Sequence, residues 1–494
     1  MITRRSLLQR SGWAMAAAAF RPALLLASES ISPVMAQLST YMSEARNRAL
    51  PDEIVEKVKQ HILDTFAAMI SGADLPPGRA AIKFARSYGG KKISTVAGSS
   101  VLCGPIEAAL TNGMLAHSDE TDDSHAPSQS HPGCAIVPAA FAVGEKFGIT
   151  GEQLLRAVAL GYDVGPRVTM TLGALSLRSE GHKSTHSIAG VFGAAAAAAC
   201  AASLTTQQMR WVLDYTAQQS SGIYAWQRDT EHIEKAFVFA GMPARSGVTA
   251  ALLVHAGWTG VNDTLSGADN FLLAYSPTAD PAGLVEKLGT RYEITRTNIK
   301  KWTVGSPIQA PLDAMEILMK RRPFTADEVQ SVVVRLAGSE AGIVDNRTMP
   351  DISLQHMIAV MLVDKTVTFH AAHDTPRLQD PAILKQRSKV RLVTDEELEK
   401  RMPSREAIVE VTLADGTVLR ERVAAVRGTA ENPMTREEVV AKARMLVAPA
   451  NGEAACTQLI EKVLSLDQVK DIREFRPLLQ RKAEPITVTS THIA

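Results

Sequence analysis

The hydrophobic periodicity of this chain changes once, and that change constrains its fold more than any other feature. From about residue 38 to residue 289, apolar residues recur every three or four positions, and strand-like alternation is nearly absent. Between about residues 295 and 432, β-branched runs alternate with polar residues, as strands do. We therefore expect a mainly α protein in which a large helical domain carries a smaller, inserted α/β domain.

Several segments of the helical part are clear enough to place individually. Thr150 and Thr205 are each followed three residues later by a Gln, a pattern that caps the first turn of a helix. Residues 194–202 are almost all Ala, which lets helices approach closely, so we expect a compact helical core. The predicted helices span residues 54–70, 154–164, 191–202, 207–215 and 247–255.

The inserted domain is indicated by alternating runs and a hairpin. Asp415-Gly416 supplies favoured residues for a tight turn between two strands. The predicted strands are 329–336, 407–413 and 417–423, with a helix at 357–363 between them and another beginning near 432–438. The predicted divisions are a helical domain at 37–294, an α/β lid domain at 295–432 and the rest of the helical domain with a tail at 433–494. A site between the two domains is expected.

Residues 1–36 are predicted to be a twin-arginine export signal. Residues 3–9 contain the Arg4-Arg5 pair, and a moderately apolar stretch follows, interrupted by Arg21. Residues 34–36 fit the positions read by a signal peptidase, so we expect cleavage before Gln37 and a periplasmic protein. The apolar run is too short for a permanent span, so no membrane association is expected after cleavage. An N-terminal amphipathic helix of the folded protein is the alternative.

Composition argues against several other classes of function. The net charge is +1 and basic residues are not clustered, so no nucleic-acid partner is expected. The four cysteines lack the spacing of metal ligands, and three sit in apolar contexts typical of buried positions. They are Cys103, Cys134, Cys200 and Cys456, of which Cys456 is the exception.

The densest group of chemically active residues lies at 116–133, between two apolar helical runs. Like charges crowded there repel one another and are costly to desolvate, so a catalytic or metal-binding role is expected. A solvated acidic loop is the plainer alternative. The group consists of His117, His125 and His131 with Asp119, Glu120, Asp122 and Asp123.

These motifs resemble the MmgE/PrpD family, whose members include 2-methylcitrate dehydratase, cis-aconitate decarboxylase and an iminodisuccinate epimerase. The likeness rests on Asn112-Gly113, on His117 with 122–125, and on His131-Pro132-Gly133, and it continues through 185–197, Lys235, 244–247, 299–302 and 351–362. The resemblance implies a helical domain with a smaller lid domain, a homodimer, a small polycarboxylate substrate, and no metal or organic cofactor.

The resemblance also implies catalytic roles. His131 matches the catalytic histidine and is expected to donate or accept a proton, since the unperturbed pKa of histidine lies near neutrality. Glu120 matches an active-site acid that is Asp in many members, and Lys235 matches a catalytic-site lysine. Ser184 stands where many members have a histidine, so His186 or His182 is expected to replace it.

Five further residues are expected to bind substrate by the same resemblance. They are Lys300, Lys301, Ser124, Asp122 and His356. Lys301 is a possible substitute for Lys300. His356 stands where the decarboxylase has an active-site tyrosine. For Asp122 a role in orienting a histidine is also open. The plainer alternatives are surface charges for the lysines and structural roles for His186 and His356.

The function expected from these residues is that of a cofactor-independent lyase, a dehydratase or a decarboxylase. Loss of a proton or of carbon dioxide next to a carboxylate leaves negative charge, and cations in a water-poor cleft stabilise that charge. A base or acid with a tuned pKa must also accept or donate the proton. An isomerase or epimerase on the same scaffold is the first alternative. A metal-dependent hydrolase on His117, Asp122, Asp123 and His131 and a non-enzymatic polycarboxylate binder are the others.

Overall fold

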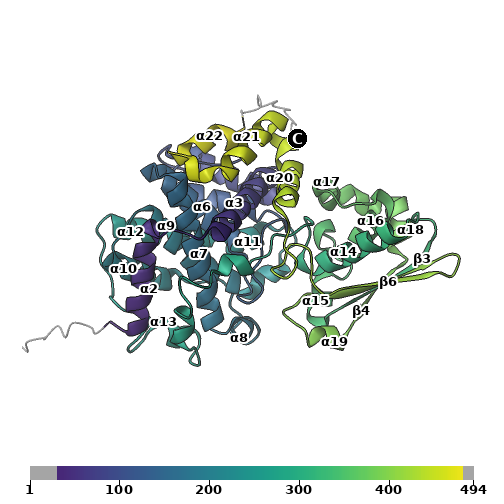
Figure 1. Cartoon of the computed structure of the whole chain (residues 1–494), viewed down its shortest axis with the longest axis horizontal. Helices are drawn as coiled ribbons and strands as arrows, with labels where there is room; N and C mark the ends of the chain where they lie inside the picture. The colour runs from purple at the N-terminus through teal and green to yellow at the C-terminus, as the bar shows by residue number, and fades with distance from the viewer. Residues whose placement is uncertain (1–30, 482–494) are drawn as a thin grey trace, which may run out of the picture.

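The computed structural model describes residues 31–481, and in it a helical body carries a smaller α/β lid on one side (Figure 1). Each part has its own hydrophobic core. The core of the body takes residues up to Ile299 and again from Met434 to Leu479. The core of the lid lies between Trp302 and Val426. The predicted fold class, mainly α with an inserted α/β domain, is confirmed.

Close packing of small residues builds the centre of the body. The Ala-rich helix α9 packs against α6, α7 and α12. A Cβ added to Gly165 of α7 would lie 2.4 Å from the carbonyl oxygen of Ala189 in α9, so only glycine allows this approach. The longer body helices before the lid are α2 (Pro33–Glu44), α3 (Asp52–Gly72), α4 (Pro76–Tyr88), α5 (Pro105–Ala116), α6 (Gly133–Phe147), α7 (Gly151–Thr171), α9 (Thr185–Ala201), α10 (Thr206–Gln219) and α12 (Met242–His255).

Shorter elements complete the body. The capping boxes predicted at Thr150 and Thr205 are present at the starts of α7 and α10. The short helices are α8 (Ala174–Ser179), α11 (Ile233–Ala236) and α13 (Phe271–Tyr275), and β1 (Ser94–Thr95) pairs with β2 (Leu102–Cys103). After the lid the chain returns to the body as α20 (Arg436–Asn451), α21 (Glu453–Leu464) and α22 (Arg476–Leu479).

The lid is a four-stranded sheet with the order β4-β3-β5-β6. The strands β3 (Val329–Leu336) and β5 (Ala407–Leu413) have the predicted bounds, and β6 (Val418–Val423) begins one residue later than predicted. The fourth strand, β4 (Val390–Thr394), pairs parallel to β3 and is not predicted from the sequence. The lid helices are α14 (Ser306–Arg321), α15 (Gly338–Val344), α16 (Leu354–Asp364), α17 (Phe369–His373), α18 (Pro381–Arg387) and α19 (Glu396–Glu399).

The residues around the predicted cleavage point belong to the folded body. Ser32 caps α2, and Met35 in the first turn of this helix is fully buried. Cleavage before Gln37 would therefore remove the first turn of α2. The Arg4-Arg5 pair and the apolar stretch after it lie outside the described residues.

Within residues 31–481, one helical run is long and apolar enough to cross a membrane, Ile233–His255. It comprises α11, a π-helical turn at Phe237–Gly241 and α12. Of its apolar window, 67% is buried inside the body, which is the packing of a core helix. This run also carries Lys235, so the core helix positions a predicted catalytic residue.

A buried ion pair connects the C-terminal helices to the rest of the body. The Nζ atom of Lys442 in α20 lies 2.6 Å from Oδ1 of Asp64 in α3, and both side chains are buried. Lys442 also donates a hydrogen bond to the carbonyl oxygen of Thr121, at 2.9 Å. Burial raises the pKa of Asp64, and the charge of Lys442 opposes that shift. The pair therefore links α3, α20 and the segment after α5.

Replacing Lys442 by Ala should lower the free energy of unfolding by about 3 kcal/mol, because Asp64 would be left buried without its cation. Urea unfolding followed by circular dichroism measures the change. Lys462 is the matched control, since this lysine of the following helix, α21, forms a more exposed pair with Glu474. Lys462→Ala should cost no more than about 1 kcal/mol. Equal losses in the two variants would contradict a special role for the buried pair.

Candidate active site

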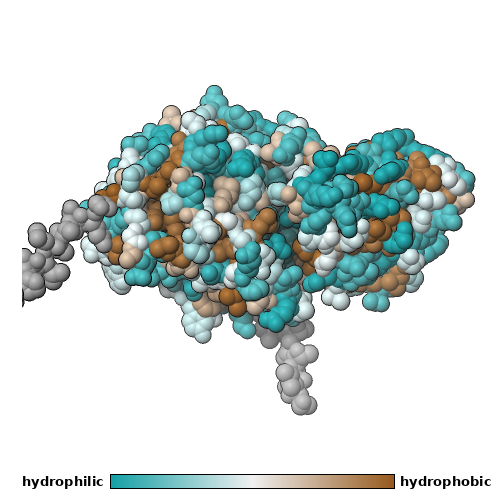
Figure 2. All heavy atoms as spheres, turned by 90° about the horizontal axis from the view of Figure 1, so that it is seen from below, coloured by the Kyte–Doolittle hydropathy of each residue, from teal (hydrophilic) through white to brown (hydrophobic). Residues whose placement is uncertain are grey.

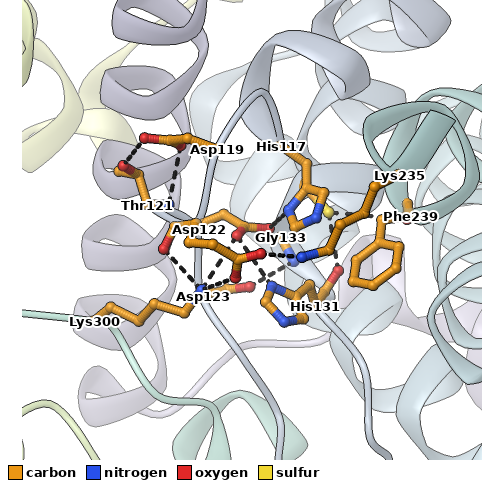
Figure 3. Close-up of polar contacts among 12 residues, drawn as sticks. His117, Asp119, Thr121, Asp122, Asp123, His131, Gly133, Lys235, Phe239 and Lys300 are labelled. Carbon is orange, nitrogen blue, oxygen red and sulfur yellow. Dashed lines mark hydrogen bonds and ion pairs between the residues drawn. The ribbon is translucent and has the colours of Figure 1, made fainter. Parts of the chain in front are cut away.

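The predicted acidic segment is a buried loop between α5 and α6, here called the site loop (residues 117–132). Its carboxylates and histidines point inward and contact one another or residues from other elements (Figure 3). Asp119, Glu120, Asp122 and Asp123 are all buried, so the alternative of a solvated acidic loop is wrong. Buried charges need partners, and each carboxylate has at least one.

Asp123 fixes the end of the site loop. Its carboxylate accepts hydrogen bonds from the hydroxyl of Tyr162 at 2.5 Å and from the backbone N–H of Gly133 at 2.9 Å. The Nδ1 atom of His61 lies 2.7 Å from the same carboxylate. Because Gly133 is the first residue of α6, Asp123 holds the loop against this helix. Its role is structural.

Asp122 holds two histidines at once. Its two oxygens each lie 3.0 Å from an Nδ1 atom, one of His117 and the other of His131. Lys300 approaches to 3.6 Å. Burial raises the pKa of Asp122, but its contacts with the two histidines and the charge of Lys300 hold this pKa well below its usual range. The ionised carboxylate therefore accepts a hydrogen bond from each Nδ1–H, and this bond leaves the Nε2 atom of His131 available toward the cavity.

Of these two histidines, His131 faces the cavity between body and lid. Burial lowers its pKa below the ordinary histidine value of 6.5, although Asp122 opposes the shift. His131 is therefore neutral at neutral pH, and its free Nε2 atom can accept a proton. This geometry agrees with the acid–base role expected for His131.

Phe239 orders the aromatic wall of the site. Its ring stacks on His117 at 4.5 Å on one side and on His186 at 3.7 Å on the other, and Trp226 meets it edge-on at 4.5 Å. Phe239 lies in the π-helical turn, an irregularity frequent at functional sites. Phe239 and Trp226 are not predicted from the sequence, where they read as ordinary core residues.

Only one of the two histidines expected to replace the family histidine at Ser184, His186 rather than His182, lies at the cavity. His186 lines the cavity in the first turn of this helix, and burial holds its pKa well below the usual range. His182 is exposed and does not line the cavity. Ser184 caps α9 and accepts a hydrogen bond from the backbone N–H of Ser187.

Glu120 lies between two lysines, which reach it from different elements. Lys235 forms an ion pair with one of its oxygens, and Lys300 lies 3.4 Å from the other. Burial raises the pKa of Glu120, but these two cations hold it well below the usual range. Glu120 and Lys235 line the cavity, whereas Lys300 does not. Lys300 is only 3% exposed and donates to the Glu120 carbonyl oxygen at 2.8 Å, so here it supports the loop instead of reaching the cavity.

The cavity lies where the body and the lid meet, and in the space-filling view the two lobes join along an indentation (Figure 2). A cavity between domains with a few convergent polar groups is the usual form of a small-molecule site. From the body it is lined by Glu120, Ser124, His131, Arg178, His186, Trp226, Lys235 and Phe239, and from the lid by Ser306, Ile343, Arg347, Met349 and Arg405. The arginines are not predicted from the sequence.

Two residues expected to bind substrate lie elsewhere. The Nζ atom of Lys301 is 2.7 Å from Oε2 of Glu316 in α14, outside this cavity. His356 is fully buried in α16 within the core of the lid, and burial lowers its pKa to about 4. Lys301 and His356 therefore do not line this cavity, and their contact with substrate stays a prediction. Ser124 lines the cavity as expected, and its backbone pairs with Asn298.

The lid also touches the site loop directly. The Nε2 atom of His373 in α17 lies 3.0 Å from Oδ2 of Asp119. Burial lowers the pKa of His373, but its contact with Asp119 and the nearby carboxylates raise this pKa overall to about 9. His373 is therefore positively charged at neutral pH. It forms an ion pair between the two domains.

One of the possible metal ligands, Glu120, is already paired with a cation. His117, Glu120 and His232 have ligand atoms within 4.8 Å of one another, and this is a possible metal-binding group within residues 31–481. The ammonium of Lys235 already contacts Glu120. Of the set expected for a hydrolase, His117, Asp122 and His131 lie together, whereas Asp123 points to Tyr162 and His61. The arrangement fits acid–base chemistry better than a metal site.

Comparisons with known proteins agree with this geometry. Residues 36–283 match the profile of the MmgE/PrpD N-terminal domain, and residues 302–468 match that of the MmgE/PrpD C-terminal domain. A cis-aconitate decarboxylase of Aspergillus terreus (strain NIH 2624 / FGSC A1156) is 25% identical over 487 residues, covering 92% of this chain and 97% of that protein. The cis-aconitate decarboxylase of Homo sapiens is 25% identical over 463 residues, covering 88% and 92%.

Replacing Asp122 by Asn should lower kcat at least about tenfold, because the ring of His131 loses the carboxylate that orients it. The pH profile should change as well. In a dehydration His131 acts as a base and works when neutral, so kcat/KM of the natural protein for that reaction should fall as the pH drops through the lowered pKa of His131. Asp122 raises that pKa, so in Asp122→Asn the acid limb should move to lower pH.

Asp123→Asn is the matched control, since Asp123 belongs to the same loop but contacts Tyr162 instead of His131. This variant should lose stability and keep the acid limb in place. An unchanged acid limb in Asp122→Asn, with normal kcat, would show that Asp122 does not position the base.

Proposed function

The chain belongs to the MmgE/PrpD family, and from this premise we propose that it is a lyase that removes carbon dioxide or water from a small polycarboxylate without a metal or organic cofactor. The observation that carries the proposal is the neutral His131, held by Asp122 and facing a cavity that also contains Lys235. A base beside fixed cations in a buried cavity is what loss of a group next to a carboxylate requires.

In the proposed reaction, His131 transfers the proton. For dehydration, its Nε2 atom removes a proton from the carbon next to a carboxylate, and the electron pair moves toward that carboxylate before hydroxide leaves. For decarboxylation, the C–C bond to one carboxylate breaks, carbon dioxide leaves, and the remaining electron pair takes a proton from His131, which must first have gained that proton from solvent. In both cases the Lys235 ammonium stabilises the developing negative charge. Glu120 holds this ammonium in place.

The relatives indicate which compound to test first. Proteins named cis-aconitate decarboxylase cover nearly the whole chain in fungi and in humans. Cis-aconitate carries three carboxylates, and the cavity presents cations from both domains. We therefore propose decarboxylation of cis-aconitate, or of a closely related polycarboxylate, as the first reaction to test.

The site of action and the assembly are part of the proposal. Arg4-Arg5 and the residues after them favour export by the twin-arginine route, and the family resemblance favours a homodimer. In cell fractions the natural protein should be periplasmic, and Arg4→Lys with Arg5→Lys should retain it in the cytoplasm. Equal distribution of both forms would contradict the export signal. A monomer in analytical ultracentrifugation would contradict the dimer.

NMR of the purified protein in deuterated water with EDTA tests the reaction, using citrate, 2-methylcitrate, cis-aconitate and amino-dicarboxylates. Loss of carbon dioxide or water from one of them is expected. Deuterium exchange or epimerisation without a new skeleton would favour the isomerase alternative. Activity only with an added divalent metal would favour a hydrolase.

On the compound that reacts, His131→Ala and Lys235→Ala should each lower turnover at least about tenfold. Lys301→Ala is the matched control, because this lysine pairs with Glu316 outside the cavity and its loss should leave the rate unchanged. Natural rates in both cavity variants would refute the site.

A further inference from the structure

Two arginines line the cavity without a carboxylate partner among residues 31–481. Arg178 lies in α8 of the body, and Arg347 lies in the lid on the segment after α15. Both side chains are half-buried. The other cations of the cavity are paired: Lys235 with Glu120, and Arg405 with Glu340 at 2.8 Å. The cavity therefore has two positive charges that the described part of the protein does not neutralise.

Arg178 is held in place without being neutralised. Its guanidinium lies 4.9 Å from the ring centroid of Tyr224 and donates a hydrogen bond to the side-chain oxygen of Gln129 at 3.3 Å. Both partners are uncharged, and all three residues line the cavity. A guanidinium positioned in this way loses little freedom when it binds an anion.

Arg347 belongs to the part of the lid that forms the cavity wall. Ile343 and Met349, on either side of it in sequence, line the same cavity. Arg347 forms no ion pair or side-chain hydrogen bond with the residues that the structure describes. A half-buried guanidinium is most stable with an anion, and its fork of N–H groups matches a carboxylate.

We propose that Arg178 and Arg347 bind two different carboxylates of one ligand, so that the bound ligand connects the body to the lid. The inference rests on the proposed function and deepens it: the substrate must carry at least two carboxylates besides any group that is lost at His131. The two arginines are then specificity-determining residues. A ligand lacking either carboxylate would bind to one domain only.

Equilibrium binding tests this inference without turnover. The probe is tricarballylate, a saturated tricarboxylate, measured by isothermal titration calorimetry. Arg178→Gln and Arg347→Gln should each weaken binding at least about tenfold, because each removes a charge-assisted pair. Lysine at either position should restore part of the affinity, since it keeps the charge but not the fork.

Matched controls remove an arginine of the same domain outside the cavity. Arg86→Gln removes an exposed arginine of α4 in the body. Arg322→Gln removes an exposed arginine of the lid, which pairs with Asp415. Neither residue lines the cavity, and both variants should bind the probe with natural affinity.

Mono-amides of tricarballylate identify which carboxylate each arginine binds. The mono-amide that lacks the carboxylate bound by Arg347 should bind to the Arg347→Gln variant and to the natural protein with equal affinity. The Arg178→Gln variant should still bind this mono-amide more weakly than the natural protein does. The converse is expected for the amide at the Arg178 position. If the two variants weakened the binding of each mono-amide to the same extent, separate binding of two carboxylates by the two arginines would be contradicted.

The outcomes separate this inference from the proposed function. Natural affinity in both glutamine variants, or no binding of tricarballylate or cis-aconitate to the natural protein, would overturn the arginine pair. Weakened binding in both variants, together with no turnover of any compound in the NMR panel, would overturn the lyase and leave the pair standing.

Discussion

The candidate site depends on one buried carboxylate, that of Asp122. A single ionised side chain receives Nδ1–H groups from two histidines and lies near Lys300, so it fixes both rings and determines which nitrogen carries the proton. An isolated carboxylate at this depth would be costly, and its cationic and hydrogen-bonding neighbours offset that cost. The same neighbours keep it ionised, which leaves His131 with a free Nε2 atom toward the cavity.

The other carboxylates of the site loop follow the same logic with different partners. Their neighbours come from five separate elements: the lid helix α17, the core run Ile233–His255, the segment around residue 300, α3 and α7. Asp119 contacts His373, Glu120 contacts Lys235 and Lys300, and Asp123 contacts His61 and Tyr162. The loop is therefore held by tertiary contacts on every side, and a short polar segment becomes a rigid part of the interior.

Local patterns in the sequence predict most of the fold. The periodicity locates most of the long body helices and three of the four lid strands, because apolar spacing records which face is buried, but it does not locate α4 or α14. The edge strand β4 escapes prediction because it is short, partly exposed and flanked by helices. The family motifs identify His131, Glu120, Lys235 and the alternative between His182 and His186.

Other parts of the site depend on contacts that only the folded chain creates. Lys300 and Lys301 are adjacent and chemically alike, and only the fold turns one toward Glu120 and the other toward Glu316. Phe239 reads as a core residue until the π-helical turn places it between two imidazoles. His356 sits on an apolar run, and its burial in the lid core follows from that run.

The return of the chain from the lid to the body has a consequence for how the protein is made. Residues from Met434 to Leu479 complete the core of the body, yet the ribosome produces them only after the entire lid. Until then α3 lacks its contacts with α20, and Asp64 is without the cation that it meets in the finished protein. Contacts so distant in sequence form late and slowly. The lid can thus acquire its own core while the body is still open, and the segment from Met434 to Leu479 then completes the body.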